Sequence, residues 1–223
     1  MINYTKNFDS VLARIEAARL KADEHRIIKI IAASKYVGAK EIEAMFNIGQ
    51  RAFGENRIQE LTEKNNTLTK LPLEWHFIGR LQSNKINHLL DANPFLIHSC
   101  ESLEMAQEID KRAAVKGMKA NILLQINSAN EASKAGVSVE EAKDTYQQII
   151  QNCENLKLKG IMSIGAHTSD EKIVAKSFEE SYKVFESLRK DGAKHCSMGM
   201  SNDFELAIKC GSNMVRLGSA LFS

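Results

Sequence analysis

The sequence predicts an α/β fold: a single (β/α)8 TIM-type barrel over residues 1–223, with an extra helix before the first strand. Short apolar runs alternate with longer amphipathic segments along the whole chain. Strands that alternate with helices pair in parallel through right-handed crossovers. Eight such units in 223 residues fit a closed barrel at the small end of its usual size range. A doubly wound open sheet is the alternative.

The individual elements follow from hydrophobic periodicity and from the residues that end helices. The first helix has an apolar face at helical spacing, and the run at 27–33 is compact and β-branched, as in a buried strand. Gly49 and Gly117 stand where two helices should stop. The predicted strands span residues 27–33, 52–54, 74–79, 95–98, 121–127, 158–164, 195–198 and 214–217. The predicted helices span residues 4–24, 39–48, 58–65, 83–90, 102–116, 139–152, 172–189 and 203–209.

The composition argues against several classes of protein. A net charge of +2 gives no electrostatic case for a nucleic-acid or membrane partner. We expect a cytoplasmic protein, because the N-terminus does not resemble a signal peptide and no apolar run approaches the ~18 residues of a membrane span. The four cysteines lack metal-ligand spacing, so we expect reduced thiols and no metal site.

Lys35 is the candidate nucleophile. It directly follows the first predicted strand, and in barrels of this kind the chemistry lies at the carboxyl ends of the strands. A lysine whose stem lies in a barrel interior is poorly solvated, and its uncharged amine forms Schiff bases with aldehydes. A solvated lysine at the start of a loop is the alternative.

Two glycine-containing turns near the C-terminus predict a phosphate site. Ser197–Ser201 reads Ser-Met-Gly-Met-Ser, and Arg216–Ser219 reads Arg-Leu-Gly-Ser. They follow the seventh and eighth strands, which is the common phosphate position in this fold. Ordinary strand-to-helix turns are the alternative. Arg216 alternates to the same side of its strand as Gly218, where it would meet either a ring nitrogen or an ion-pair partner.

Several other polar residues are candidates for the same face of the barrel. Asn56 can exchange hydrogen bonds with a phenolate or hydroxyl group of a ligand. His76 lies within a strand, where a hydrogen-bonded core histidine is favoured over a catalytic one. Lys85 and Lys134 are either solvated lysines or further amines near the barrel mouth.

Together these motifs resemble the pyridoxal phosphate homeostasis protein family. They appear in order over nearly the whole chain: Ala-Ala-Ser-Lys35, Phe-Gly-Glu-Asn56, Trp-His-Phe-Ile-Gly79, Leu-Gln-Ser-Asn-Lys85, Ser-Met-Gly-Met-Ser201 and Val-Arg-Leu-Gly218. The family resembles the N-terminal barrel of alanine racemase and of bacterial ornithine-type decarboxylases. Arg80 and Tyr36 depart from the family pattern, and Tyr36 alters the expected shape of the pocket mouth.

The resemblance implies a role for each candidate residue. Lys35 would carry pyridoxal phosphate (PLP) as a Schiff base, and Arg216 would face the pyridine nitrogen. Asn56 would approach the cofactor ring and its phenolic oxygen. The remaining implied ligands would hold the phosphate: Ser201, Gly218 and Ser219.

Three functions are compatible with such a site. The first is a non-catalytic carrier that buffers PLP and passes it to apo-enzymes. The second is a PLP-dependent amino-acid racemase or decarboxylase, and the third is a barrel that binds phosphate sugars or nucleotides. The length favours the carrier, because racemases of this fold add a second domain that also forms their dimer interface. We therefore expect a monomer that is not an enzyme.

Overall fold

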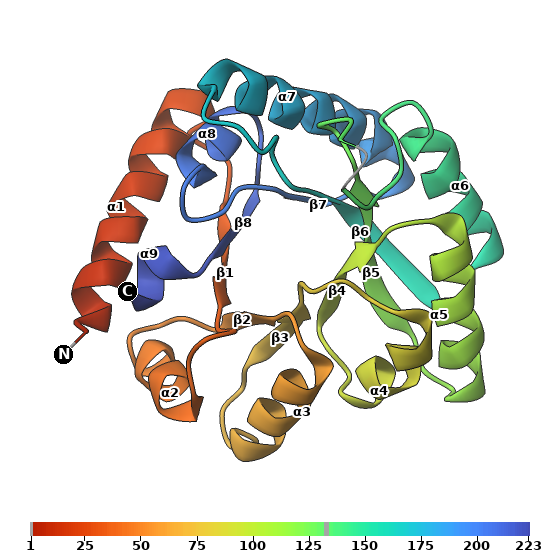
Figure 1. Ribbon diagram of the computed structural model, residues 1–223, viewed down its shortest axis with the longest axis horizontal. Helices are drawn as coiled ribbons and strands as arrows, with labels where there is room; N and C mark the ends of the chain where they lie inside the picture. Colours follow the sequence, from red (N-terminus) through yellow and green to blue (C-terminus); the bar gives the residue numbers. More distant parts are fainter. Residues whose placement is uncertain (1, 132–133) are drawn as a thin grey trace.

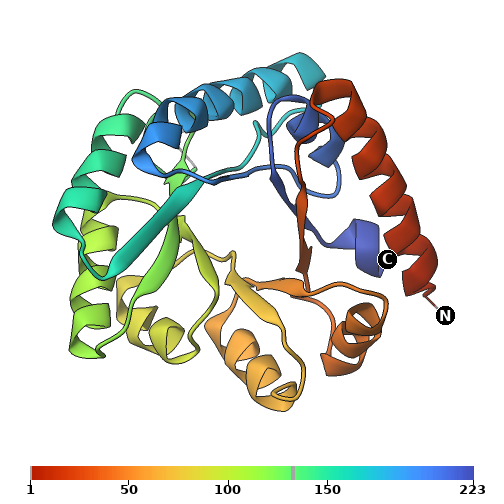
Figure 2. The ribbon, with the colours of Figure 1, turned by 180° about the vertical axis from the view of Figure 1, so that it is seen from behind.

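The computed structural model describes residues 2–131 and 134–223. Its strands form a closed barrel in which each strand pairs in parallel with its neighbours in chain order, and β8 returns to β1 (Figure 1). Helices surround this barrel on the outside, as the view from behind also shows (Figure 2). The predicted closed barrel is confirmed, and the open sheet is excluded.

The elements alternate from one end of the chain to the other. The strands are β1 (Lys29–Ala33), β2 (Ala52–Glu55), β3 (Glu74–Phe77), β4 (Leu96–Cys100), β5 (Ala120–Ile126), β6 (Leu156–Ser163), β7 (His195–Ser197) and β8 (Met214–Leu217). The α-helices are α1 (Tyr4–Ala22), α2 (Ala39–Asn47), α3 (Ile58–Thr67), α4 (Ile86–Asp91), α5 (Leu103–Val115), α6 (Ala142–Asn152), α7 (Glu171–Leu188), α8 (Phe204–Lys209) and α9 (Ser219–Phe222). Two 3-10 turns are η1 (Ser83–Lys85) and η2 (Arg189–Asp191).

The boundaries differ from the predicted ones by a few residues. The first strand begins at Lys29, where its pairing with β8 starts, and not at residue 27, which is 87% exposed. The segment at 83–90 opens as the 3-10 turn η1 before it becomes α4. Helix α9 was not predicted, since four residues are too few to show a helical period.

The barrel interior is packed with side chains. Alternate residues of each strand point inward, and an apolar group from six strands fills part of this space. Its members are at most 3% exposed: Ile31, Ala52, Leu96, Leu123, Met162 and Met214. The outward residues, such as Phe53 and Trp75, pack in the clusters that include residues of the surrounding helices. The barrel is therefore a core whose carboxyl end can carry a site.

The extra helix α1 packs on the outside of the barrel against α8 and α9. Its buried face, Val11, Ile15 and Ala18, packs in the same cluster as residues of α8 and α9. Asn7 donates hydrogen bonds to the carbonyls of Leu221 and Ser223, so the first turn of α1 lies beside the C-terminal end of the chain (Figures 1 and 2). Within the described part of the chain, no helix combines the length and apolar character needed to cross a membrane.

Candidate functional site

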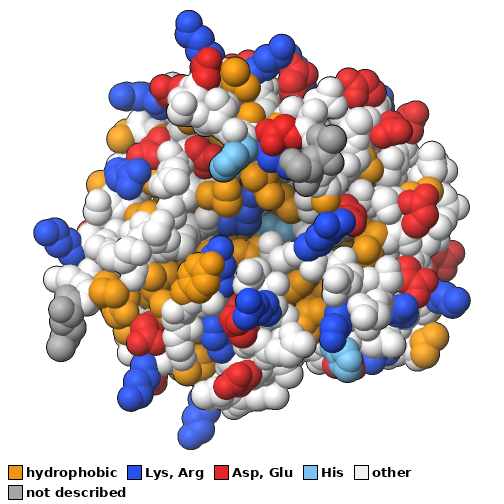
Figure 3. Space-filling view, in the orientation of Figure 1, with side chains coloured by type: hydrophobic (Ala, Val, Ile, Leu, Met, Phe, Trp, Pro, Cys, Tyr) orange, Lys and Arg blue, Asp and Glu red, His pale blue; other side chains and the backbone are white. Residues whose placement is uncertain are grey.

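A cavity of about 1350 Å³ lies at the carboxyl ends of the strands. Figure 3 shows a hollow at the centre of this face, with Lys or Arg side chains inside it and hydrophobic side chains around its rim. The cavity brings together every residue singled out from the sequence as a cofactor ligand. These lining residues are Lys35, Asn56, Ser201, Arg216, Gly218 and Ser219.

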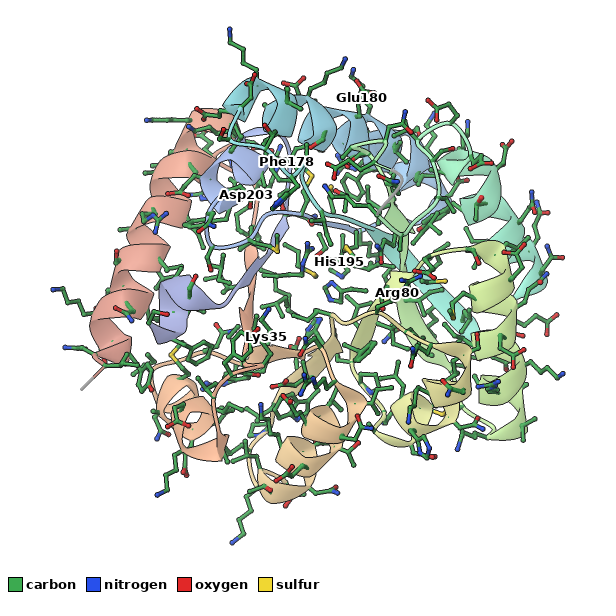
Figure 4. The ribbon with its side chains drawn as sticks, viewed as in Figure 1. Lys35, Arg80, Phe178, Glu180, His195 and Asp203 are labelled. Atoms are coloured by element: carbon green, nitrogen blue, oxygen red, sulfur yellow. The ribbon has the colours of Figure 1, made fainter. Side chains whose placement is uncertain are left out.

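Lys35 enters this cavity from the end of β1. Ser34 before it is fully buried, whereas Lys35 is half-buried and its Nζ lies 4.9 Å from the centre of the Tyr36 ring. Figure 4 shows Lys35 beside β1 at the barrel mouth. In the part of the chain that the structure describes, its amine has no hydrogen bond or ion pair with protein. The amine is therefore placed to react with a ligand in the cavity.

A buried ion pair holds the segment that carries Lys35, and the sequence did not reveal it. The Glu55 side chain is 0% exposed, and its Oε1 accepts hydrogen bonds from Ser34 Oγ at 2.6 Å and Lys64 Nζ at 2.7 Å. Lys64 Nζ also donates to the Ser34 carbonyl at 2.9 Å. Burial raises the pKa of the Glu55 carboxyl, while Lys64 and Ser34 act in the opposite direction. The residue before Lys35 is thus fixed through both its hydroxyl and its carbonyl.

Asn56 is positioned by a close approach between two loops. A Cβ atom on Gly79 would lie 2.0 Å from the Asn56 carbonyl oxygen, so a larger residue at 79 would push the Asn56 backbone away. The backbone of Ile78 also bonds to the Glu55 carbonyl at 2.9 Å. Gly79 in the Trp-His-Phe-Ile-Gly motif is therefore needed to bring the loop after β3 against Asn56.

The two predicted phosphate turns lie against each other. Gly199 has a φ of 95° and a Cβ there would meet Ala207 of α8 at 2.6 Å, so the first turn requires glycine. Ser201 Oγ accepts hydrogen bonds from the backbone N–H groups of Gly218 at 3.1 Å and Ala220 at 3.2 Å. Both lone pairs of this hydroxyl are then used, which leaves its hydrogen for an acceptor in the cavity.

Arg216 is held by the barrel wall. Its Nη1 donates to the Ser197 carbonyl at 2.8 Å and to Ser197 Oγ at 2.7 Å, and its Nη2 donates to the Ser163 carbonyl at 2.9 Å. Burial lowers the pKa of its guanidinium to about 10, so the group stays charged at neutral pH. A guanidinium has five N–H donors, and these contacts use three of them. The residue also lines the cavity, where the remaining donors can meet a ligand.

The other candidate residues from the sequence lie in three different places. Lys134 lines the cavity, and its Nζ bonds to Glu131 Oε1 at 2.8 Å and to the Gly165 carbonyl at 2.7 Å. Lys85 lines a separate groove between α3 and α4, so it is not an amine of this mouth. His76 is buried in the barrel interior and bonds to His98, as expected for a core histidine.

Comparisons with known proteins identify the family of this chain. The model of the alanine racemase N-terminal domain matches residues 7–223. A pyridoxal phosphate homeostasis protein of Helicobacter pylori (strain J99) is 50% identical over 222 residues, which cover 100% of this chain and 99% of that protein. Its counterpart in Aquifex aeolicus is 36% identical and covers 99% of this chain and 98% of that protein.

Solved structures show the same barrel. PipY of Synechococcus elongatus, solved with PLP bound, has a TM-score of 0.83 and 27% identity, covering 99% of this chain and 100% of its own. An alanine racemase of Clostridium difficile has a TM-score of 0.73 and 20% identity, covering 96% of this chain and 56% of the racemase. The racemase likeness shows the fold alone. This chain belongs to the pyridoxal phosphate homeostasis protein family, whose barrel is of the alanine racemase N-terminal type.

Proposed function

We propose that this protein binds PLP as a Schiff base on Lys35 and serves in the intracellular homeostasis and carriage of that cofactor. The observation that carries the proposal is the single cavity in which an amine, an arginine and two serine-containing turns meet. The relatives named for PLP homeostasis, and the PipY structure with PLP bound, support it further.

The donor set matches the three reactive or charged parts of PLP. The uncharged amine of Lys35 would add to the aldehyde carbon, and the aldehyde oxygen would leave as water with the two amine hydrogens. The free hydroxyl hydrogen of Ser201, with Ser219 and the backbone of the Gly218 turn, would hold the phosphate. Asn56, which lines the same cavity, would bond to the phenolic oxygen.

Arg216 favours carriage over catalysis. A buried guanidinium is a donor only, so at a pyridine nitrogen it would hold that nitrogen unprotonated. PLP with an unprotonated ring is a weaker sink for electrons than PLP beside a carboxylate. The residue thus retains the cofactor while weakening the carbanion chemistry that a racemase or decarboxylase needs.

The open mouth of the cavity is suited to exchange of the cofactor. Apolar side chains stand exposed at its edge: Tyr36 at 88%, Met200 at 41% and Ile164 at 38%. Water reaches such a site, which weakens the electrostatic stabilisation of charged transition states. The same opening would let PLP enter, leave and pass to apo-PLP enzymes. We further propose that the protein acts as a cytoplasmic monomer.

A titration with PLP tests the proposal. Wild-type protein should give the absorbance of a Schiff base, and Lys35→Ala should lose it. Lys134→Ala is the matched control, because it removes another lysine of the same cavity, and it should retain that absorbance. An unchanged spectrum in Lys35→Ala would reject Lys35 as the attachment point.

The non-catalytic part needs a separate assay. The PLP-loaded protein is incubated with each common L-amino acid in deuterated water. We expect no deuterium at Cα and no decarboxylation on the timescale of turnover. D-isomer formation near one per second, the low end of typical enzyme rates, would establish the racemase instead.

A further inference from the structure

A column of polar side chains crosses the barrel interior below the cavity. Arg216 Nη1 donates to Ser197 Oγ at 2.7 Å, and Ser197 Oγ lies 3.2 Å from His98 Nδ1. His98 Nε2 lies 2.9 Å from His76 Nδ1, and His76 Nε2 lies 3.7 Å from Glu74 Oε2. Four strands, β3, β4, β7 and β8, supply these residues. The column therefore joins the cofactor cavity to the opposite end of the barrel.

The middle of this column is shut off from solvent. His76, His98 and Ser197 are each 0% exposed, and Arg216 is 6% exposed. Glu74 lies at the start of β3, at the end of the barrel away from the cavity, where it also pairs with Lys29. Buried polar groups of this kind need partners, so the direction of the hydrogen bonds between Arg216 and His76 can be worked out. His76 Nε2 makes no hydrogen bond within the described residues, and Glu74 is the charged group that it faces.

Arg216 at one end of the column and Glu74 at the other favour the same direction for the hydrogen bonds between them. The Arg216 guanidinium can only donate, so Ser197 Oγ accepts from it and can donate its own hydrogen to His98 Nδ1. His98 Nε2–H then donates to His76 Nδ1, which leaves His76 Nε2–H toward Glu74. The ionised carboxylate of Glu74 favours a hydrogen on the nitrogen that faces it. Burial lowers the pKa of both His76 and His98, which agrees with neutral rings.

We propose that His98 is a positioning residue that, through the Ser197 hydroxyl, fixes the Arg216 guanidinium for its contact with the ring nitrogen of PLP. The proposal rests on the proposed function, which supplies the ligand. As an acceptor, His98 Nδ1 turns the Ser197 hydrogen away from Arg216 and directs a lone pair toward Nη1. The guanidinium is then anchored on both β7 and β6, because Nη2 bonds to the Ser163 carbonyl.

Nitrogen-15 NMR of the histidine side chains tests the column without any cofactor. In wild-type protein at neutral pH, His76 and His98 should both be neutral, with hydrogen on Nε2 and none on Nδ1. A hydrogen on Nδ1 of His98, or an imidazolium at either position, would overturn the assigned direction. This measurement stands even if PLP does not bind, so it separates failure of the column from failure of the proposed function.

Affinity measurements test the coupling to the cofactor. Ser197→Ala removes the hydroxyl and keeps the carbonyl that also binds Arg216. His98→Phe removes the acceptor from a ring of similar shape. Each should weaken PLP binding by about tenfold or more, as for a lost hydrogen bond to a charged group. Neither should change binding of a PLP analogue with carbon in place of the ring nitrogen, because Arg216 then has no acceptor there.

Ser181→Ala is the matched control. Ser181 is also fully buried, and its hydroxyl bonds to Ser163 Oγ and to the Ser177 carbonyl, so neither contact involves Arg216. This control should leave PLP affinity unchanged. If Ser197→Ala weakened PLP and the carbon analogue equally, or matched Ser181→Ala, the positioning role would be rejected. Thermal melts of each variant show whether it folds. The NMR result on wild-type protein tests the direction of the hydrogen bonds in the column whether or not the variants fold.

Discussion

Replacement of Lys64 with methionine tests how the Lys35 segment is held. The change keeps the length of the side chain and removes the only charge that neutralises Glu55 within 4 Å in residues 2–131 and 134–223. Glu55 is 0% exposed and Lys64 is 13% exposed, so this is a buried pair. Breaking such a pair from one side costs about 3 to 5 kcal/mol, since the other charge is left buried.

Chemical denaturation with urea measures this loss. We expect a lower free energy of unfolding for Lys64→Met at neutral pH, and partial recovery in the double variant Lys64→Met/Glu55→Gln. Burial already raises the pKa of Glu55, and loss of Lys64 raises it further. The folded state then holds a proton that the unfolded chain releases, so the variant should become more stable as the pH falls toward the usual carboxyl range. A change below about 0.5 kcal/mol, as at an ordinary surface site, would show that Lys64 does not stabilise the buried Glu55 carboxylate.

Three further predictions follow from the site. Ser201→Ala should weaken PLP binding by about tenfold to a hundredfold in an absorbance titration and leave unphosphorylated pyridoxal nearly unaffected, because the lost donor serves the phosphate; equal losses would reject the assignment. Gly79→Ala should lower the free energy of unfolding in a urea melt by about 1 to 3 kcal/mol, because the new Cβ would lie 2.0 Å from the Asn56 carbonyl oxygen. Gly218→Ala is the control and should be as stable as wild type, because the nearest atom to its new Cβ is 3.6 Å away. Burial lowers the pKa of His195 to about 4, so the folded state binds fewer protons than the unfolded chain, and stability should fall as the pH drops from about 6.5 to about 4. His195→Gln should make that part of a melting-temperature profile less steep, and the remaining slope comes from His76 and His98, whose pKa burial also lowers.

The sequence sufficed for the barrel and for the residues at its mouth. Alternating strands and helices predict parallel pairing, and the carboxyl ends of all parallel strands lie on one face. Lys35 and Arg216 therefore had to be neighbours of one cavity, although 181 positions separate them along the chain.

Contacts within the interior could not be predicted in the same way. His76 and His98 meet because β3 and β4 are adjacent, but the depth and rotamer that bring their rings together depend on packing. Glu55 follows the predicted strand at 52–54 and Lys64 lies within the predicted helix at 58–65, but no sequence pattern pairs the two residues. A buried carboxylate needs a cation as its partner, so the burial of Glu55 would have pointed to a nearby lysine or arginine. That burial is known only from the structure.

The attachment of PLP to Lys35 is tested most directly by reduction and peptide mapping. The protein is loaded with PLP, treated with borohydride and digested, and mass spectrometry then locates the added mass. We expect a reduced PLP adduct on the peptide that contains Lys35 and an unmodified peptide around Lys134. An adduct confined to Lys134, or to any other lysine, would reject Lys35 as the attachment point.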